Sequence, residues 1–238
     1  MFRFPNLAQS VPSRVSLLLA AALAFSVSAA RSQAPIQAPI QVLDASALHP
    51  PLGARVAIVE FDDLQCPACA AANPTLKAAA AQYKIPWLRL DFLIPYHNWS
   101  RNAAINARWF DLQSKALGDE YRDQLFANQS SIYNPGSLAQ FTQTFARGHG
   151  VTLPFSVDPQ GKLASEVDAD GALARRTGIT STPTIFVVAA NSKGKAFAQV
   201  LNPAQDLYTT IDRALADTAP PLKPAPAKTP APKKSSGK

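Results

Sequence analysis

The sequence predicts an α/β domain in which a block of helices is inserted between strands of a small mixed sheet. A strand–helix–strand order occupies residues 55–92, helical spacing dominates residues 100–177, and strand-like runs return over residues 184–201. Strand, helix and strand in this order are typical of a β-α-β unit with parallel strands. With 238 residues, the chain is long enough for one domain with a substantial core and too short for two large ones.

The first three elements follow one another directly. Residues 55–61 (RVAIVEF) are a short apolar run rich in β-branched residues, which predicts a buried strand. The Ala-rich stretch from Cys66 to Tyr83 predicts a helix. We expect Pro74 to kink this helix, because proline lacks the backbone donor and crowds the preceding turn. Residues 87–92 (WLRLDF) predict the second strand.

The middle of the chain is predicted to be helical, and its end returns to strands. Apolar residues recur at helical spacing over three segments, which are residues 100–127, 137–147 and 161–177. We therefore place a helical insertion at about residues 95–178. Three elements close the domain: a buried strand at residues 184–189, a pairing strand at 196–201 and a last helix at 204–215.

Both ends of the chain differ in composition from this domain. Residues 1–30 combine a positive start with the short apolar run 15–27 and end in small residues, which predicts a cleavable signal peptide. An uncleaved membrane anchor is the alternative, and either leaves the remaining chain periplasmic or otherwise exported. We expect a Pro/Gln linker at residues 31–41, the folded domain at 42–218, and a disordered Pro/Lys-rich tail at 219–238.

The formal net charge of +7 comes from the two ends of the chain. Arg3 and Arg14 contribute +2 over residues 1–30, five lysines contribute +5 over residues 219–238, and neither end holds an acid. Subtracting both from +7 leaves residues 31–218 neutral. A basic groove for nucleic acid is therefore not expected.

The chain has only two cysteines, Cys66 and Cys69, at the start of the first predicted helix. Exported proteins meet an oxidising compartment, where cysteines normally pair. A bridge between positions three apart closes a very small loop and removes little chain entropy, so it stabilises a fold poorly. The spacing therefore favours a redox-active pair, with an inert local disulfide as the alternative.

The place of the pair in the chain explains how it would react. A helix N-terminus presents unpaired N–H groups and a partial positive charge, which stabilise a thiolate on Cys66 and lower its pKa. We expect Cys66 to be the exposed nucleophile and Cys69 the resolving thiol that breaks the mixed disulfide. Pro67 suits the first helical turn, where no N–H partner is lost. A zinc site would need two more ligands than the scattered histidines offer, and haem attachment would need a histidine where Ala70 stands.

Two further features extend this motif. Glu60 lies six residues before Cys66, at the end of the first strand. Burial there would raise the pKa of Glu60 and let it exchange a proton during thiol chemistry, whereas a solvent-facing glutamate is the alternative. Thr182-Pro183 stands just before the third predicted strand. A cis proline there would put a tight turn beside the cysteines, where Thr182 N–H and C=O would bind an extended peptide by strand addition.

Two stretches resemble the DsbA-like branch of thioredoxin-fold proteins: the one from Val59 to Cys69 and residues 178–187 with their Thr-Pro-Thr. The resemblance covers about residues 42–216. It implies a periplasmic thiol–disulfide oxidoreductase that passes its disulfide to reduced or misoxidised exported proteins. It also implies reoxidation by a membrane quinone-linked partner, and no cofactor or metal beyond the cysteine disulfide itself.

The resemblance also assigns roles to individual residues. The residues implied in the reaction are Cys66 as the attacking cysteine, Cys69 as the resolving one and Glu60 as the buried acid. The residues implied in substrate binding are Pro67, Ala68, Thr182 and Pro183, of which Pro183 is the cis proline.

The chain departs from the strongest oxidants of this branch at Ala68, where those members carry a histidine that helps hold the thiolate. We therefore expect the pKa of Cys66 to lie below the ordinary thiol value of about 8.5 but well above about 3.5, giving a weaker oxidant. Thr182 also resembles the disulfide-isomerase branch, so a reductase or isomerase is the first alternative. A non-catalytic binding or chaperone module is the second. Isomerases dimerise through a sizeable N-terminal domain, and only a short linker precedes the fold here, so we expect a monomer.

Three polar residues near the motif have two interpretations each. His97 follows the second strand and precedes a helix, where it either lines the active-site face or serves in capping and packing. Asp62 and Asp63 either shape the potential near Cys66 or are solvated loop residues. The sequence leaves these alternatives open.

Overall fold

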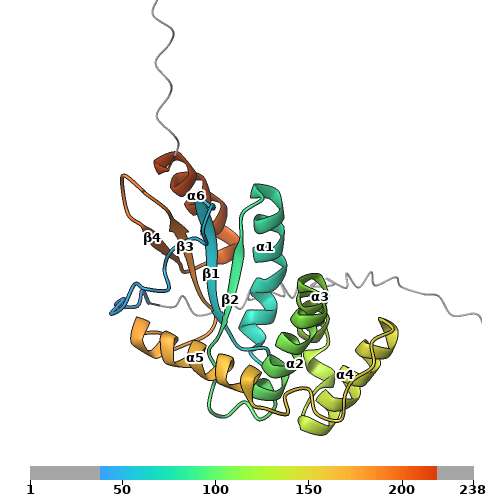
Figure 1. The fold of residues 1–238 in the computed structure, drawn as a ribbon. Coiled ribbons are helices and arrows are strands. Elements are labelled where there is room, and N and C mark those ends of the chain that lie inside the picture. The colour runs from blue at the N-terminus through green and yellow to red at the C-terminus, as the bar shows by residue number, and fades with distance from the viewer. Residues whose placement is uncertain (1–37, 219–238) are drawn as a thin grey trace, which may run out of the picture. The chain divides into compact units, whose positions relative to one another are not determined.

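The computed structural model describes residues 38–218, which form a four-stranded mixed sheet with helices on both faces (Figure 1). The strands lie in the order β2-β1-β3-β4, with bounds β1 Val56–Asp62, β2 Trp87–Asp91, β3 Thr184–Ala189 and β4 Phe197–Val200. β1 and β2 are parallel, while β3 is antiparallel to both β1 and β4. The predicted α/β fold with a parallel strand pair and a helical insertion is confirmed.

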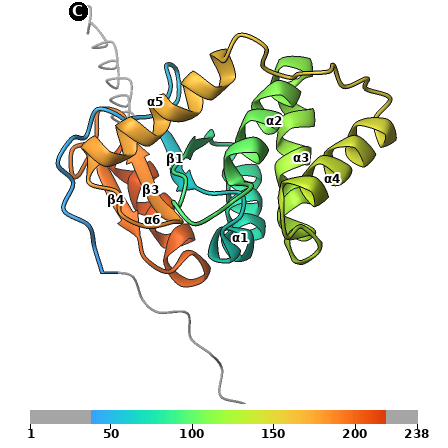
Figure 2. The ribbon, with the colours of Figure 1, turned by 90° about the horizontal axis from the view of Figure 1, so that it is seen from below.

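The two central strands are buried along their whole length. β1 and β3 therefore need continuous apolar runs instead of an alternating pattern, because helices cover both faces of the sheet. On one face, α1 (Pro67–Tyr83) and α6 (Pro203–Asp217) pack around Ile58 and Leu76. On the other face, α5 (Lys162–Thr177) and the segment before β1 pack around Phe61 and Phe186 (Figure 2).

The inserted helices lie beside α1 (Figure 2). Their bounds are α2 Ser100–Gln113, α3 Lys115–Ala127 and α4 Pro135–Gly148, with a short 3₁₀ helix, η1, at Gln129–Ser131. Residues 100–127, for which helical spacing was found, form two helices, because the chain is extended at Ser114. The Ser114 Oγ accepts the N–H of Leu117 at 3.1 Å, so α3 begins with its own N-cap.

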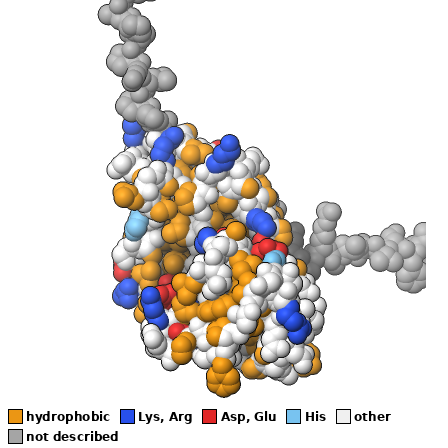
Figure 3. Space-filling view, turned by 45° about the vertical axis from the view of Figure 1, so that its right-hand side comes forward, with side chains coloured by type: hydrophobic (Ala, Val, Ile, Leu, Met, Phe, Trp, Pro, Cys, Tyr) orange, Lys and Arg blue, Asp and Glu red, His pale blue; other side chains and the backbone are white. Residues whose placement is uncertain are grey.

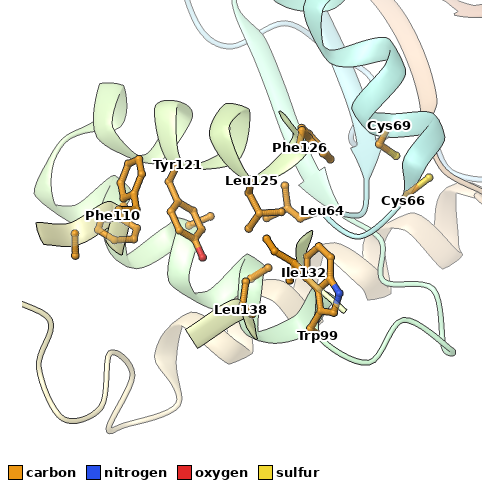
Figure 4. Close-up of a cluster of buried hydrophobic side chains, with 14 residues drawn as sticks. Leu64, Cys66, Cys69, Trp99, Phe110, Tyr121, Leu125, Phe126, Ile132 and Leu138 are labelled. Carbon is orange, nitrogen blue, oxygen red and sulfur yellow. The ribbon is translucent and has the colours of Figure 1, made fainter. Parts of the chain in front are cut away.

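The helical block has its own aromatic core, and this core reaches the two cysteines (Figure 4). The Phe110 ring lies 4.7 Å from the Tyr121 ring and 4.9 Å from the Phe145 ring, between ring centres. The same buried cluster continues to Cys66 and Cys69 at the start of α1. The insertion therefore packs directly against the cysteine loop.

The segment before β1 is tied to the far edge of the sheet. The N–H of Ile40, within the predicted linker, donates to Gln199 Oε1 of β4 at 2.9 Å. Gly178 lies next to this segment with a φ of +90°, and a Cβ at this position would lie 2.6 Å from the carbonyl oxygen of Gln41. A side chain at residue 178 would therefore both strain the backbone and push the segment away.

Residues 38–218 contain no helix that is long and apolar enough to cross a membrane. Within the same range, no group of three or more His, Cys, Asp or Glu side chains is placed to hold a metal ion. The predicted signal peptide and tail lie outside the described residues. On the face that Figure 3 shows, Lys and Arg side chains are scattered singly, and hydrophobic side chains gather in a hollow between them.

Candidate active site

Cys66 and Cys69 lie where β1 passes into α1. β1 ends at Asp62, a short loop follows, and Cys66 is the N-cap residue of α1 with Pro67 in the first turn. The Cys66 N–H donates to the carbonyl oxygen of Asp63 at 2.8 Å, which holds the loop closed. No side chain caps α1, so its first N–H groups remain available to the sulfur of Cys66.

Both sulfurs are more enclosed than the spacing of the cysteines predicts. Cys66 is 7% exposed and Cys69 is fully buried, so the prediction of an exposed Cys66 is wrong. The physical reason is that both cysteines pack into the buried cluster of the helical block. Residues 94–97 and 180–182, which are distant in sequence, lie beside the cysteine loop. With Cys66, Pro67 and Ala68 they line an open cavity of about 510 Å³, through which Cys66 is reached.

The two thiols have opposite electrostatic environments. The hydrogen bond with the Cys69 thiol lowers the pKa of Cys66 to about 6, helped by Thr182 and by the backbone N–H groups of Cys69 and Ala68. Burial raises the pKa of Cys69 well above the ordinary thiol value. The direction and size of the Cys66 shift agree with the expectation from Ala68, and the arrangement separates a reactive sulfur from one that keeps its proton.

Thr182 contacts the sulfur of Cys66 from outside the cysteine loop. The Thr182–Pro183 peptide bond is cis, as predicted. The Cys66 Sγ lies 3.5 Å from the carbonyl oxygen of Thr182, which accepts a hydrogen bond from the thiol. The buried Thr182 hydroxyl has no hydrogen-bond partner among the described residues, so it is free to donate to a Cys66 thiolate.

Glu60 is buried in the middle of β1, so the solvent-facing alternative is wrong. Its Oε2 accepts the indole N–H of Trp87 at 3.0 Å, and its Oε1 has no partner within residues 38–218. Burial, followed by the charge of Asp62, raises the pKa of Glu60 to about 8. Asp62 is also buried, paired to Arg89 Nη2 at 3.1 Å, so the interpretation of Asp62 as a solvated loop residue is wrong. The charges of both acids raise the pKa of Cys69 further.

Sequence comparison places this architecture in a family. A family model described as thioredoxin matches residues 52–202, which is more than half of the chain and includes all four strands and both cysteines. The chain belongs to the thioredoxin family. Within this family, the helical block between β2 and β3 and the late Thr182-Pro183 bend agree with the predicted DsbA-like arrangement.

One relative of this thioredoxin-family chain is named for disulfide bond formation. Disulfide bond formation protein D of Bacillus subtilis (strain 168) is 25% identical over 150 residues, which are 56% of this chain and 64% of that protein. The chain therefore spans slightly less than two thirds of that relative.

Solved structures with the same fold include three that are described as DsbA or BdbD proteins. BdbD from Bacillus subtilis has a TM-score of 0.54 at 20% identity, covering 76% of this chain and 99% of BdbD. Pseudomonas aeruginosa DsbA2 has a TM-score of 0.53 at 21% identity, covering 78% and 99% of the two chains. Wolbachia pipientis alpha-DsbA1 has a TM-score of 0.57 at 17% identity, covering 71% and 90%. The predicted DsbA-like fold is confirmed.

One side chain that holds the cysteine loop was not predicted. Gln129, from η1 of the helical block, donates through Nε2 to the carbonyl oxygens of Leu64 at 2.8 Å and Cys66 at 3.1 Å. The residues around Gln129 carry no pattern that signals this role, because the contact exists only once the helical block has packed against α1. It connects the insertion to the reactive end of the thioredoxin-family sheet.

Asp63 and His97 form a second feature at the cavity. Asp63 is fully buried, so its interpretation as a solvated loop residue is wrong. Its Oδ2 lies 2.9 Å from His97 Nδ1 and accepts the N–H of Ile94 at 2.8 Å, while its Oδ1 accepts the N–H of Gln65 at 2.8 Å. His97 lines the same cavity as Cys66. The two alternatives for His97 are therefore compatible, since it both packs on the loop through Asp63 and lines the cavity that leads to Cys66.

Proposed function

We propose that this chain is an exported thiol–disulfide oxidoreductase that exchanges disulfides with exported proteins through Cys66 and Cys69. The observation that carries the proposal is the asymmetry of the pair. Cys66 opens to a cavity and has a lowered pKa, whereas Cys69 lies behind it, fully buried, with a raised pKa. A nucleophile that is reached by substrate and a resolving thiol that is shielded from it are the two parts that disulfide exchange needs.

The proposed reaction starts from the oxidised Cys66–Cys69 pair and a substrate with two thiols. A substrate thiolate attacks the sulfur of Cys66, a mixed disulfide forms, and Cys69 leaves with the electron pair of the broken bond and takes up a proton. The second substrate thiolate then attacks the mixed disulfide and expels Cys66 as a thiolate. The substrate gains a disulfide and loses two electrons, which the cysteine pair gains.

The remaining predicted residues have defined places in this proposal. Glu60, buried beneath α1 near Cys69, is proposed to supply and recover the proton of the resolving thiol. Thr182 and Pro183 are proposed to bind the substrate backbone by strand addition, with Pro67 and Ala68 contacting it across the cavity.

Export and partners are proposed on the sequence features and on the names of relatives. The signal peptide at residues 1–30, the linker at 31–41 and the tail at 219–238 are proposed to flank a single monomeric domain. The Bacillus relative is named a disulfide bond formation protein, which supports proteins that acquire disulfides as substrates. A membrane quinone-linked oxidase is proposed to take the two electrons from the reduced pair.

Cysteine variants test the proposal directly. With Cys69→Ala, the resolving thiol is absent, so mixed disulfides between Cys66 and substrates should accumulate and identify those substrates by mass spectrometry. The double variant Cys66→Ser with Cys69→Ala is the matched control and should trap nothing. If cells that carry only Cys66→Ser keep full function, the chain is a binding or chaperone module and the catalytic proposal fails.

The direction of exchange is a separate question within the same chemistry. Ala68 replaces the thiolate-holding histidine of the strong oxidants that the chain resembles, which favours a weaker oxidant and keeps a reductase or isomerase as the second candidate. A glutathione redox titration of the purified domain separates them. A potential above that of the glutathione pool supports the oxidase, and a potential near about −270 mV supports the reductase.

A further inference from the structure

The Asp63–His97 pair is built into the wall of the cavity that leads to Cys66. Asp63 belongs to the loop between β1 and α1, and His97 belongs to the loop that follows β2. The His97 side chain is 12% exposed and the Asp63 carboxyl is fully buried. The exposed Tyr96 ring packs edge-on against the imidazole, with ring centres 5.0 Å apart. His97 and Cys66 line the same cavity.

The hydrogen bonds of Asp63 fix which nitrogen of His97 carries the proton. Each Asp63 oxygen already accepts a backbone N–H, one from Ile94 and one from Gln65. An ionised carboxylate can only accept, so His97 Nδ1 must be the donor in its 2.9 Å contact with Oδ2. In the neutral ring, Nε2 is then left as an unprotonated acceptor. This is the arrangement of an oriented base, in which a buried carboxylate holds the imidazole.

We propose that His97, oriented by Asp63, takes the proton from a substrate thiol as that thiol approaches Cys66. The proton passes from the substrate sulfur to His97 Nε2, and the thiolate formed attacks Cys66 of the oxidised pair. The substrate–Cys66 bond forms as the Cys66–Cys69 bond breaks, and Cys69 leaves with the electron pair. In the reverse direction, protonated His97 returns the proton to the departing substrate thiolate. This role rests on the proposed oxidoreductase function.

A base of this kind matters because ordinary thiols are poor nucleophiles at neutral pH. A thiol with a pKa of about 8.5 is less than about 1% ionised at pH 6. The titratable groups that face His97 are the carboxyl of Asp63 from the β1–α1 loop, Tyr96 from its own loop and, across the cavity, Cys66. The benefit of His97 should therefore be greatest at acidic and neutral pH and vanish once the substrate ionises by itself.

The test compares wild type with His97→Gln in the oxidation of a short dithiol peptide, using fully oxidised protein between pH 6 and pH 9.5. The variant should be about tenfold slower at pH 6, and the two rates should converge above pH 9. Asp63→Asn should show the same pattern, because a neutral amide no longer stabilises the imidazolium that forms when His97 takes up the proton. His149→Gln, which changes a histidine outside the cavity, is the matched control and should match wild type throughout.

A second readout separates proton transfer from a change in Cys66 itself. Alkylation of reduced Cys66 by iodoacetamide needs no substrate base, so its rate should be the same in wild type and His97→Gln. Equal oxidation rates at every pH, or a loss in the variant that is the same at pH 6 and pH 9.5, would overturn the role of His97. If oxidised wild type does not oxidise the dithiol peptide and reduced wild type does not reduce its disulfide form, the oxidoreductase proposal itself has failed instead.

Discussion

Replacing Glu60 with glutamine removes a buried ionisable group and keeps the shape of the side chain. Trp87 Nε1 donates to Glu60 Oε2 at 3.0 Å, and the carbonyl oxygen of glutamine accepts the same bond. Glu60 Oε1 has no partner among the described residues. An amide NH₂ at this place resembles the O–H of the protonated acid, so Glu60→Gln imitates the neutral form of Glu60.

The expected effect follows from the raised pKa of Glu60. Burial and the charge of Asp62 raise this pKa from 4.5 to about 8 in the folded protein. Between these values the folded state holds a proton that the unfolded state has lost, so the unfolding free energy falls as pH rises. The stabilisation from Glu60 is complete below pH 4.5 and is lost by about pH 8. At about 1.4 kcal/mol per pH unit, the loss between pH 5 and pH 7 is about 3 kcal/mol.

Urea unfolding of the reduced protein at pH 5 and pH 7 measures this loss. The unfolding free energy of wild type should drop by about 3 kcal/mol more than that of Glu60→Gln over this range. Glu166→Gln replaces a glutamate whose side chain is 44% exposed and should keep the wild-type pH dependence. An identical pH dependence in wild type and Glu60→Gln would refute the reasoning.

Two further predictions concern the cysteine loop. The thiolate absorbance of the reduced protein should titrate with a midpoint of about 6 for Cys66, and a midpoint near about 3.5 would contradict the argument from Ala68. Gln129→Ala removes two hydrogen bonds to the loop and should make opening of the loop easier by about 1–2 kcal/mol, seen as faster amide exchange at Cys66. The exposed Gln143→Ala on α4 is its control, and equal exchange in both variants would show that Gln129 does not hold the loop.

The central strands and the helix that carries the cysteines were predictable because their signals are local. A strand that is covered on both faces needs a continuous apolar run. Such runs at β1 and β3 therefore identified both strands by composition alone. Cys66 and Pro67 mark the start of α1 by residue type. The helix break at Ser114 was missed, because a serine can either continue a helix at its surface or cap the next one.

The surroundings of the cysteines were less predictable, because they come from segments that are distant in sequence. The enclosure of Cys66 depends on packing against the helical block, and its cavity is lined by residues 94–97 and 180–182. The composition of these segments does not reveal that they meet at the start of α1. The buried states of Asp62 and Asp63 depend likewise on partners from β2 and the loop after it, Arg89 and His97. A charged residue at a strand end is ordinarily solvated, so only tertiary contacts could indicate otherwise.

The sequence by itself determined the order of strands and helices, the two sulfurs three positions apart at a helix start, and the acid six residues before them. These features follow from residue types and their spacing over short stretches of sequence. The tertiary structure decided which sulfur is reached by solvent, which carboxyls lose their water, and which histidine nitrogen pairs with Asp63. Burial and hydrogen bonding between distant segments set these properties, because they change pKa values and solvent exposure. Such contacts leave no local pattern in the sequence.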